Sequence, residues 1–146
     1  MSIYVPSIQG IYTPLASAVR TVTQVVNGRN LIDPNYNTGY SGNGINPEVA
    51  GLIAYLNVTV APGVETLTLV LEEQDPASLV WSTVASTTAT VATGMIRMKV
   101  KPSITAVAAT ITGVTVQDQL PAIWRVRVVH SASGNWTYSL GVILYS

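Results

Sequence analysis

Cysteine and phenylalanine are absent from this chain of 146 residues, which has a single histidine and only two lysines. The lack of Cys excludes disulfides, thiolate metal sites and thiol redox chemistry, and it fits assembly in a reducing compartment. Charged residues make up 10 % of the chain, against roughly 25 % in an ordinary soluble domain. Because so few charges are available to solvate an isolated surface, we expect self-association or docking onto a larger body.

The positive charges do not gather into a footprint for nucleic acid. The net charge is zero, and Lys and Arg are scattered apart from local groups at 97–101 and 125–127. The sequence has no run of about eighteen apolar residues, and its first ten residues lack a basic region followed by an apolar one. We therefore expect neither a nucleic-acid partner, nor a membrane span, nor a secretory signal.

Several segments are rich in Val, Thr, Ile and Leu, and in them apolar and polar side chains alternate with the period of a β-strand. In 95–101, for example, Ile96, Met98 and Val100 share one phase, whereas Arg97 lies on the other. About eight to ten such segments, with no amphipathic helical pattern, are typical of a sandwich or barrel. The sequence predicts an all-β, single-domain β-sandwich or barrel, and we favour a jelly-roll-like version.

Turn signals suggest which of these strands pair. Asn27-Gly28 ends the alternating stretch from Ala18 to Val26 and predicts a hairpin or a sharp corner. Pro62-Gly63 predicts that the strands on either side of it pair as neighbours. The stretch 131–135, SASGN, has the composition of a hairpin loop between the last two strands.

The N-terminal residues contain a short near-repeat, IYVP at 3–6 and IYTP at 11–14. Each Pro removes a backbone donor and favours extended geometry in the residue before it. We predict an extended N-terminal arm over residues 1–17, followed by a domain over 18–146. The arm either reaches a neighbouring subunit or lies as an edge strand on its own domain. Its candidate contact residues are Ile3, Tyr4, Pro6, Ile11, Tyr12 and Pro14.

A long loop is predicted over 33–47, where Asn, Gly and Tyr replace the aliphatic residues. Loops of this length are uncommon in compact domains unless they bind something or are disordered. Tyr36 and Tyr40 are therefore candidate contact residues, and a mobile loop with incidental Tyr side chains is the alternative.

No constellation for catalysis, a cofactor or a metal stands out. His130 ends a strand on the phase of buried positions, which favours a half-buried, hydrogen-bonded histidine over a catalytic one. Glu72, Glu73 and Asp75 form the one acidic cluster, but Glu72 and Glu73 point to opposite faces of a strand. We expect a solvated strand end there, rather than a glycosidase pair or a calcium site, and we expect no enzyme activity.

The remaining candidate residues are the three tryptophans and the arginines Arg125 and Arg127. Trp124 and Trp136 share phases with aliphatic residues and are expected in the core, whereas the place of Trp81 is open. Arg125 and Arg127 lie on the opposite face from Trp124, either solvated or paired with carboxylates of a neighbour.

Residues 65–146 contain the succession LTLVLEEQDPASLVWSTVAS, and later LPAIWRVRVVHSASGNWTYSLGVILYS. This part resembles small β-rich bacteriophage virion proteins, which have a similar "QDPAS…W" corner and a similar "LP…WRVRV" ending. The resemblance implies a head decoration, or cement, protein, assembled in the host cytoplasm and bound to the lattice of the major capsid protein. It also implies a homo-oligomer, commonly a trimer with N-terminal arms. The alternative is a receptor-binding or tail-associated module that contacts a surface glycan through loop 33–47.

Overall fold

The structure is a computed structural model that describes residues 8–32 and 50–145. This part of the chain forms ten strands and one helical turn. They are β1 (Ile8–Arg20), β2 (Gln24–Asn27), α1 (Gly28–Ile32), β3 (Gly51–Val60), β4 (Leu67–Gln74), β5 (Trp81–Ser86), β6 (Gly94–Lys101), β7 (Val107–Thr110), β8 (Gly113–Gln117), β9 (Trp124–His130) and β10 (Trp136–Tyr145).

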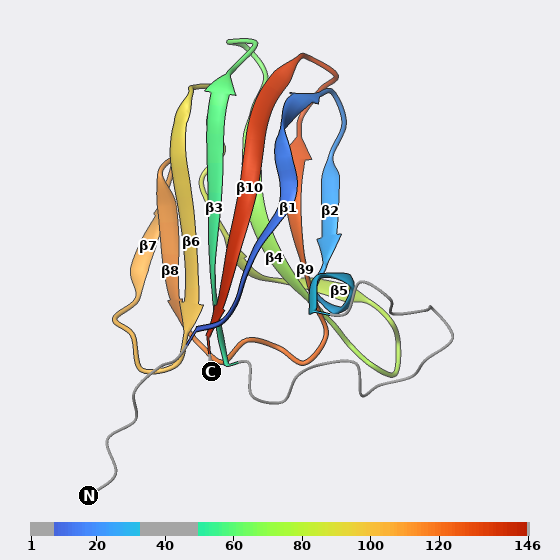
Figure 1. Cartoon of the computed structure of the whole chain (residues 1–146), viewed down its shortest axis with the longest axis vertical. Helices are drawn as coiled ribbons and strands as arrows, with labels where there is room; N and C mark the ends of the chain where they lie inside the picture. Colours follow the sequence, from blue (N-terminus) through green and yellow to red (C-terminus); the bar gives the residue numbers. More distant parts are fainter. Residues whose placement is uncertain (1–7, 33–49, 146) are drawn as a thin grey trace, which may run out of the picture.

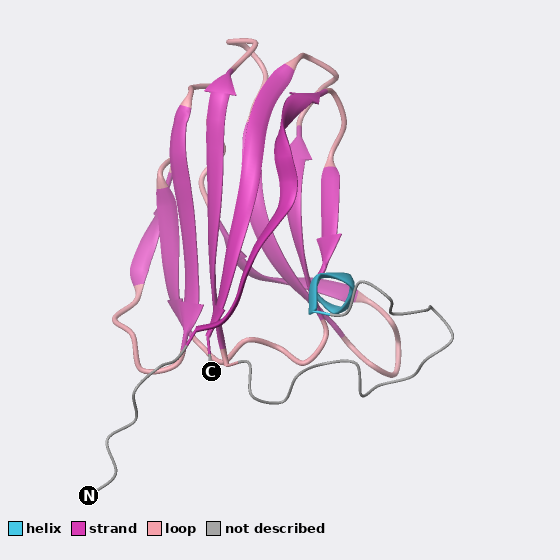
Figure 2. Cartoon of the chain, viewed as in Figure 1, coloured by secondary structure: helices cyan, strands magenta, loops and turns pink. Residues whose placement is uncertain are grey.

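The strands form two sheets, and the predicted all-β sandwich is confirmed. One sheet has six strands in the order β1-β10-β3-β6-β8-β7, and the other has four in the order β2-β9-β4-β5. Figure 1 shows the two layers side by side, and Figure 2 shows that strands dominate the described chain. All neighbouring strands are antiparallel except β6 and β8, which are parallel.

A single apolar core lies between the sheets, because strand alternation sends every second side chain inward. Every second residue of β10, from Trp136 to Leu144, is buried. The facing sheet contributes Leu67, Leu69 and Leu71 from β4, together with alternate residues of β9. The predicted core positions of Trp124 and Trp136 are confirmed, since the two side chains are 3 % and 0 % exposed.

Four of the strand pairs are nested within one another along the chain. β4 pairs with β5, β3 with β6, β2 with β9, and β1 with β10, each of them antiparallel. The pairing is alternately in one sheet and in the other. The described chain is therefore a long two-stranded ribbon rolled into a sandwich, with the short strands β7 and β8 added at one edge (Figure 1).

Two predicted strand pairings are wrong. β3 lies in the six-stranded sheet and β4 in the four-stranded one, so Pro62-Gly63 belongs to a connection between sheets. Likewise β9 and β10 lie in different sheets, and 131–135 crosses the end of the sandwich instead of closing a hairpin. In both cases the inward apolar side chains of the two strands belong to the one core between the sheets.

The predicted boundary between arm and domain at residue 17 falls inside β1. β1 runs unbroken from Ile8 to Arg20 and pairs with β10 of its own domain, which matches the edge-strand alternative. Residues 1–7 lie outside the described residues, as do the predicted loop contacts in 33–47. The expected strand over Ala18 to Val26 is divided, because the chain leaves one sheet after Arg20 and enters the other at Gln24.

Asn27-Gly28 begins the helical turn α1 and does not close a hairpin. A Cβ on Gly28 would overlap the ring of Trp124, so the residue at this corner must lack a side chain for the tryptophan to pack against the backbone. Of the two predicted alternatives, the sharp corner is therefore correct, and the tryptophan that requires the glycine lies in β9, far along the chain.

Candidate interaction surfaces

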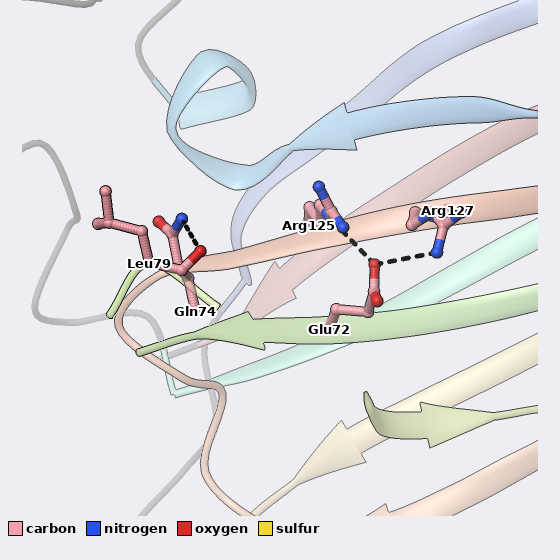
Figure 3. Close-up of polar contacts among 5 residues, drawn as sticks. All are labelled: Glu72, Gln74, Leu79, Arg125 and Arg127. Atoms are coloured by element: carbon pink, nitrogen blue, oxygen red, sulfur yellow. Dashed lines mark hydrogen bonds and ion pairs between the residues drawn. The ribbon is translucent and has the colours of Figure 1, made fainter. Parts of the chain in front are cut away.

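Arg125 and Arg127 lie on the outer face of the four-stranded sheet, because β9 turns Trp124, Val126 and Val128 inward. The register of β4 with β9 places Glu72 directly opposite Arg125. Nε of Arg125 donates a hydrogen bond of 2.8 Å to Oε1 of Glu72, and Nη1 of Arg127 lies 3.5 Å from the same oxygen (Figure 3). One carboxylate therefore holds both guanidinium groups.

Glu72 is 7 % exposed, so the expected solvated strand end is wrong for this residue. β9 and β5 flank it on either side, and Arg125 and Arg127 cover its carboxylate. Glu73, on the opposite phase, is exposed as expected. The ion pair could not be inferred from the sequence, because the two partners are 53 residues apart and meet only through the pairing of β4 with β9.

Trp81 completes this cluster from the edge strand β5. The guanidinium carbon of Arg125 lies 4.1 Å from the centre of the Trp81 ring, which is within the range of a cation–π contact. Arg125 is thus fixed between a carboxylate and an aromatic face. Arg127 makes only the longer ion pair among the described residues, so its remaining donors face solvent.

The β4–β5 turn extends the same end of the sheet and displays apolar side chains. Oδ1 of Asp75 accepts a hydrogen bond from the Ala77 amide, and Oδ2 accepts one from the Ser78 hydroxyl. The backbone hydrogen bond from Ala77, followed by that of the Ser78 hydroxyl, lowers the pKa of Asp75. The Gln74 amide donates to the Leu79 carbonyl at 2.9 Å (Figure 3). Held in this way, the turn exposes Leu79 (63 %) and Val80 (62 %) next to Trp81.

A second apolar region follows β1, β2 and their connection at the open edge of the sandwich. Its exposed side chains are Ile8, Ile11, Val19, Val22 and Val25. A pocket of about 300 Å³ opens beside them between the two sheets, walled mainly by Pro14, Leu15, Val25, Val26 and Leu31. We call these side chains and the pocket together the β1–β2 edge.

The sequence-predicted contact residues of the N-terminal segment have different places. Ile11 is exposed, and Pro14 lines the pocket, so both belong to the β1–β2 edge. Tyr12 instead packs against the core. Ile3, Tyr4, Pro6, Tyr36 and Tyr40 lie outside the described residues.

One residue of the β1–β2 edge, Val25, shares the outer face of the four-stranded sheet with the arginine pair. In the antiparallel register of β2 with β9, Val25 lies opposite Arg127 and Asn27 lies opposite Arg125. Val25 therefore borders the arginines, whereas Ile8, Ile11 and Val19 pair with outward residues of β10 and lie on the outer face of the six-stranded sheet. The sequence singles out the two arginines but does not predict that Val25, Trp81 and the β4–β5 turn lie near them.

His130 belongs to a partly buried cluster at the far end of the same sheet. Its Nε2 lies 2.8 Å from the Tyr138 hydroxyl, and its ring meets Trp136 edge-on. Burial lowers the pKa of His130, an effect that Glu65 opposes and Arg20 reinforces, and it raises the pKa of Tyr138 to about 12. The expectation of a half-buried, hydrogen-bonded histidine is confirmed.

No group of three or more His, Asp or Glu side chains in 8–32 and 50–145 is arranged to hold a metal ion. Within the same ranges, no helix has the length and apolar character needed to cross a membrane. No family model matches the chain, and no curated protein or solved structure is detectably similar to it.

Proposed function

We propose that the chain is a structural protein of a bacteriophage virion, a decoration protein that binds the assembled head and stabilises it. The observation that carries the proposal is the surface on the outer face of the four-stranded sheet, where Val25, Trp81 and the exposed β4–β5 turn lie near the Arg125–Arg127 pair. Its partner in this proposal is the lattice of the major capsid protein on the head surface, reached after assembly in the host cytoplasm. The resemblance of residues 65–146 to small virion proteins supports the same function.

The composition of this surface is that of a protein–protein interface. Interface cores are enriched in aromatic residues and Arg and depleted of Lys and acidic residues. Trp81, Arg125 and Arg127 lie beside exposed aliphatic side chains, and the carboxylate that pairs with the arginines, Glu72, is buried beneath them. Because Glu72 and Trp81 already fix Arg125, docking would cost little side-chain entropy at that residue.

The nested strand pairing also supports the proposal. Strands β1-β10-β3-β6 facing β2-β9-β4-β5 give two antiparallel four-stranded layers linked by crossing connections, and we infer from this order that the sandwich is a jelly roll. Viral capsid proteins are among the users of the jelly roll, together with lectins and cupins. A fold shared so widely supports a function only in combination with a site, which here is the surface described above.

Binding to many equivalent positions of a lattice needs only a modest affinity at each one. Assembly as a homotrimer, which is part of this proposal, would multiply the contacts made by each particle and raise the overall affinity through avidity. The apolar side chains of β1 that do not contact the head are then available for contacts between copies.

The test is binding of the purified protein to heads of the phage whose genome encodes it, measured by co-sedimentation. A deletion of residues 2–17 would remove most of β1, so point substitutions are the better probe. Val25→Asp places a carboxylate in the middle of the surface, and we expect it to weaken binding by about tenfold or more. Val64→Asp, at an 87 % exposed residue of the β3–β4 connection, is the matched control and should bind normally.

Both variants must retain the melting temperature of the parent protein for the comparison to hold. Undiminished binding of Val25→Asp, or no binding of the parent protein to heads, would reject the proposal. Saturable binding to a cell-surface glycan in place of heads would favour the receptor-binding alternative.

A further inference from the structure

A second pocket lies at the opposite edge of the six-stranded sheet, where β6, β8 and β7 lie side by side (Figure 1). Its volume is about 260 Å³. Two cationic side chains, Arg97 and Lys99, and three threonines, Thr110, Thr112 and Thr115, contribute to its lining. No Asp or Glu is among the lining residues.

The register of the strands explains why the two cations converge on this pocket. β6 turns Ile96, Met98 and Val100 into the core, which places Arg97 and Lys99 on the outer face. In the parallel pairing with β8, Arg97 lies beside Gly113 and Lys99 beside Thr115. A Cβ on Gly113 would overlap the Arg97 carbonyl oxygen, so only glycine permits this close approach of the strands.

The charges of Arg97 and Lys99 are uncompensated within the described chain. No ion pair, side-chain hydrogen bond or ring contact joins either one to another described residue. By contrast, Arg125 and Arg127 share Glu72, and Lys101, the next outward residue of β6, has its ammonium 4.2 Å from the centre of the Tyr145 ring. Two adjacent unpaired cations repel each other, and an anion placed between them would remove that cost.

The threonines supply the neutral donors that an anion site also uses. The hydroxyls of Thr110 and Thr112 lie 3.1 Å apart in the β7–β8 turn and are fixed by it. The Thr115 hydroxyl, beside Lys99, has no hydrogen-bond partner among the described residues. The lining of the pocket thus includes a guanidinium, an ammonium and a free hydroxyl that a bound anion can use.

From this arrangement we infer that the β6–β8–β7 pocket binds an oxyanion, a carboxylate, sulfate or phosphate group carried by a ligand or by a partner's surface. An Arg fork matches the paired oxygens of each of these groups. Drug-sized ligands occupy pockets of roughly 300–1,000 Å³, so a pocket of about 260 Å³ accepts one anionic group with few attached atoms. The site lies at β7, the edge opposite β1, and does not depend on the function proposed above.

The test is a titration of the ¹⁵N-labelled protein, separately with sodium acetate, sulfate and phosphate, at constant ionic strength. We expect saturable shifts confined to amides around the pocket, those of Thr112, Gly113 and Thr115 among them. The anion that binds most tightly identifies the chemistry of the natural ligand: acetate stands for a carboxylate, and sulfate or phosphate stands for a tetrahedral group.

Arg97→Gln and Lys99→Gln should each weaken binding by about tenfold or more, because each removes a charge-assisted contact. Lys101→Gln removes the same charge from the same face of β6 but outside the pocket, and it should change affinity by no more than about twofold. The absence of saturable shifts, or an equal loss in all three variants, would overturn the inference. Head binding is measured in a separate experiment, so failure of anion binding would not reject the virion proposal, and failure of head binding would not reject the anion site.

Discussion

At Glu72, one carboxylate oxygen determines the position of two guanidinium groups. Its side chain is largely buried under Arg125 and Arg127, which are themselves partly exposed. Removal of the negative charge would leave two neighbouring cations facing each other with no anion between them. Glu72 therefore acts on the candidate surface through the residues it positions.

We predict that Glu72→Gln lowers the free energy of unfolding by about 2 kcal/mol, because it breaks a mostly buried ion pair whose partners stay in place. Urea denaturation measures this change. Glu73→Gln, at the next residue, which is exposed near the end of β4, should change stability by less than about 0.5 kcal/mol. Equal effects of the two substitutions would show that Glu72 contributes no more to the free energy of unfolding than an ordinary surface carboxylate.

His130 gives a prediction about pH. Burial lowers its pKa in the folded chain, whereas in the unfolded chain the pKa lies near the ordinary value of about 6.5. Above about pH 6.5 both states are neutral at this residue. As the pH falls below that value the unfolded chain takes up the proton first, so stability is progressively lost toward the folded pKa.

We therefore expect the parent protein to lose more stability between about pH 7.5 and pH 5 than His130→Gln, which retains a polar side chain that does not titrate. The measurement is the urea midpoint of unfolding of each protein at the two pH values, and the change with pH is compared between them. Carboxylate titrations are common to both proteins and cancel in the comparison. Identical pH dependence would mean that the histidine is as well solvated when folded as when unfolded.

At the scale of elements, alternation predicted the strands and their inward faces but not their partners. Pro62-Gly63 and the SASGN stretch are chemically ordinary hairpin signals, yet each connects different sheets. A turn signal records that the chain changes direction, and it does not record whether the next strand lies beside the previous one or across the core. The Glu72–Arg125 contact depends on that missing information, since it joins strands that are remote in sequence. The two pockets, by contrast, lie between elements that follow one another along the chain, β1 to α1 and β6 to β8.

The close approach of β6 and β8 gives an element-scale prediction. Gly113→Ala would drive its Cβ into the Arg97 carbonyl, a backbone atom that cannot move without disturbing the parallel pairing. We expect a loss of about 1–3 kcal/mol in unfolding free energy. Gly141→Ala is the matched control, because its Cβ would meet only the Tyr12 carbonyl oxygen at an ordinary 3.8 Å. A tolerated Gly113→Ala would contradict the described packing of these two strands.

At the scale of the whole molecule, the nested pairing makes the sandwich a single cooperative unit. β1 can pair only once β10 has been added, and β2 only once β9 is present, so no half of the chain contains a complete set of partners. The overall class, an all-β sandwich or barrel with one domain, followed from composition and period alone. Its nested order did not, because strand order depends on loop closures between distant segments that leave no local pattern.

Cooperativity of this kind predicts one unfolding transition and slow refolding. Fluorescence of the buried Trp124 and Trp136 and far-UV circular dichroism should report the same midpoint. Refolding should take roughly milliseconds to seconds, as is usual for folds dominated by pairings between remote segments. Two separate midpoints would show that one sheet survives without the other.

The pairing of Ile8 with Tyr145 has a practical consequence for engineering. Tyr145 also pairs with Gly51, and Thr137 pairs with Val60, so the turn after β3 is at the opposite pole from both of these residues. A peptide fused beyond Ile8 or beyond Tyr145 would thus be displayed from a common pole. A circular permutant that links the two ends and opens the chain near Gly63 would present its cargo from the other pole, with every strand pair kept.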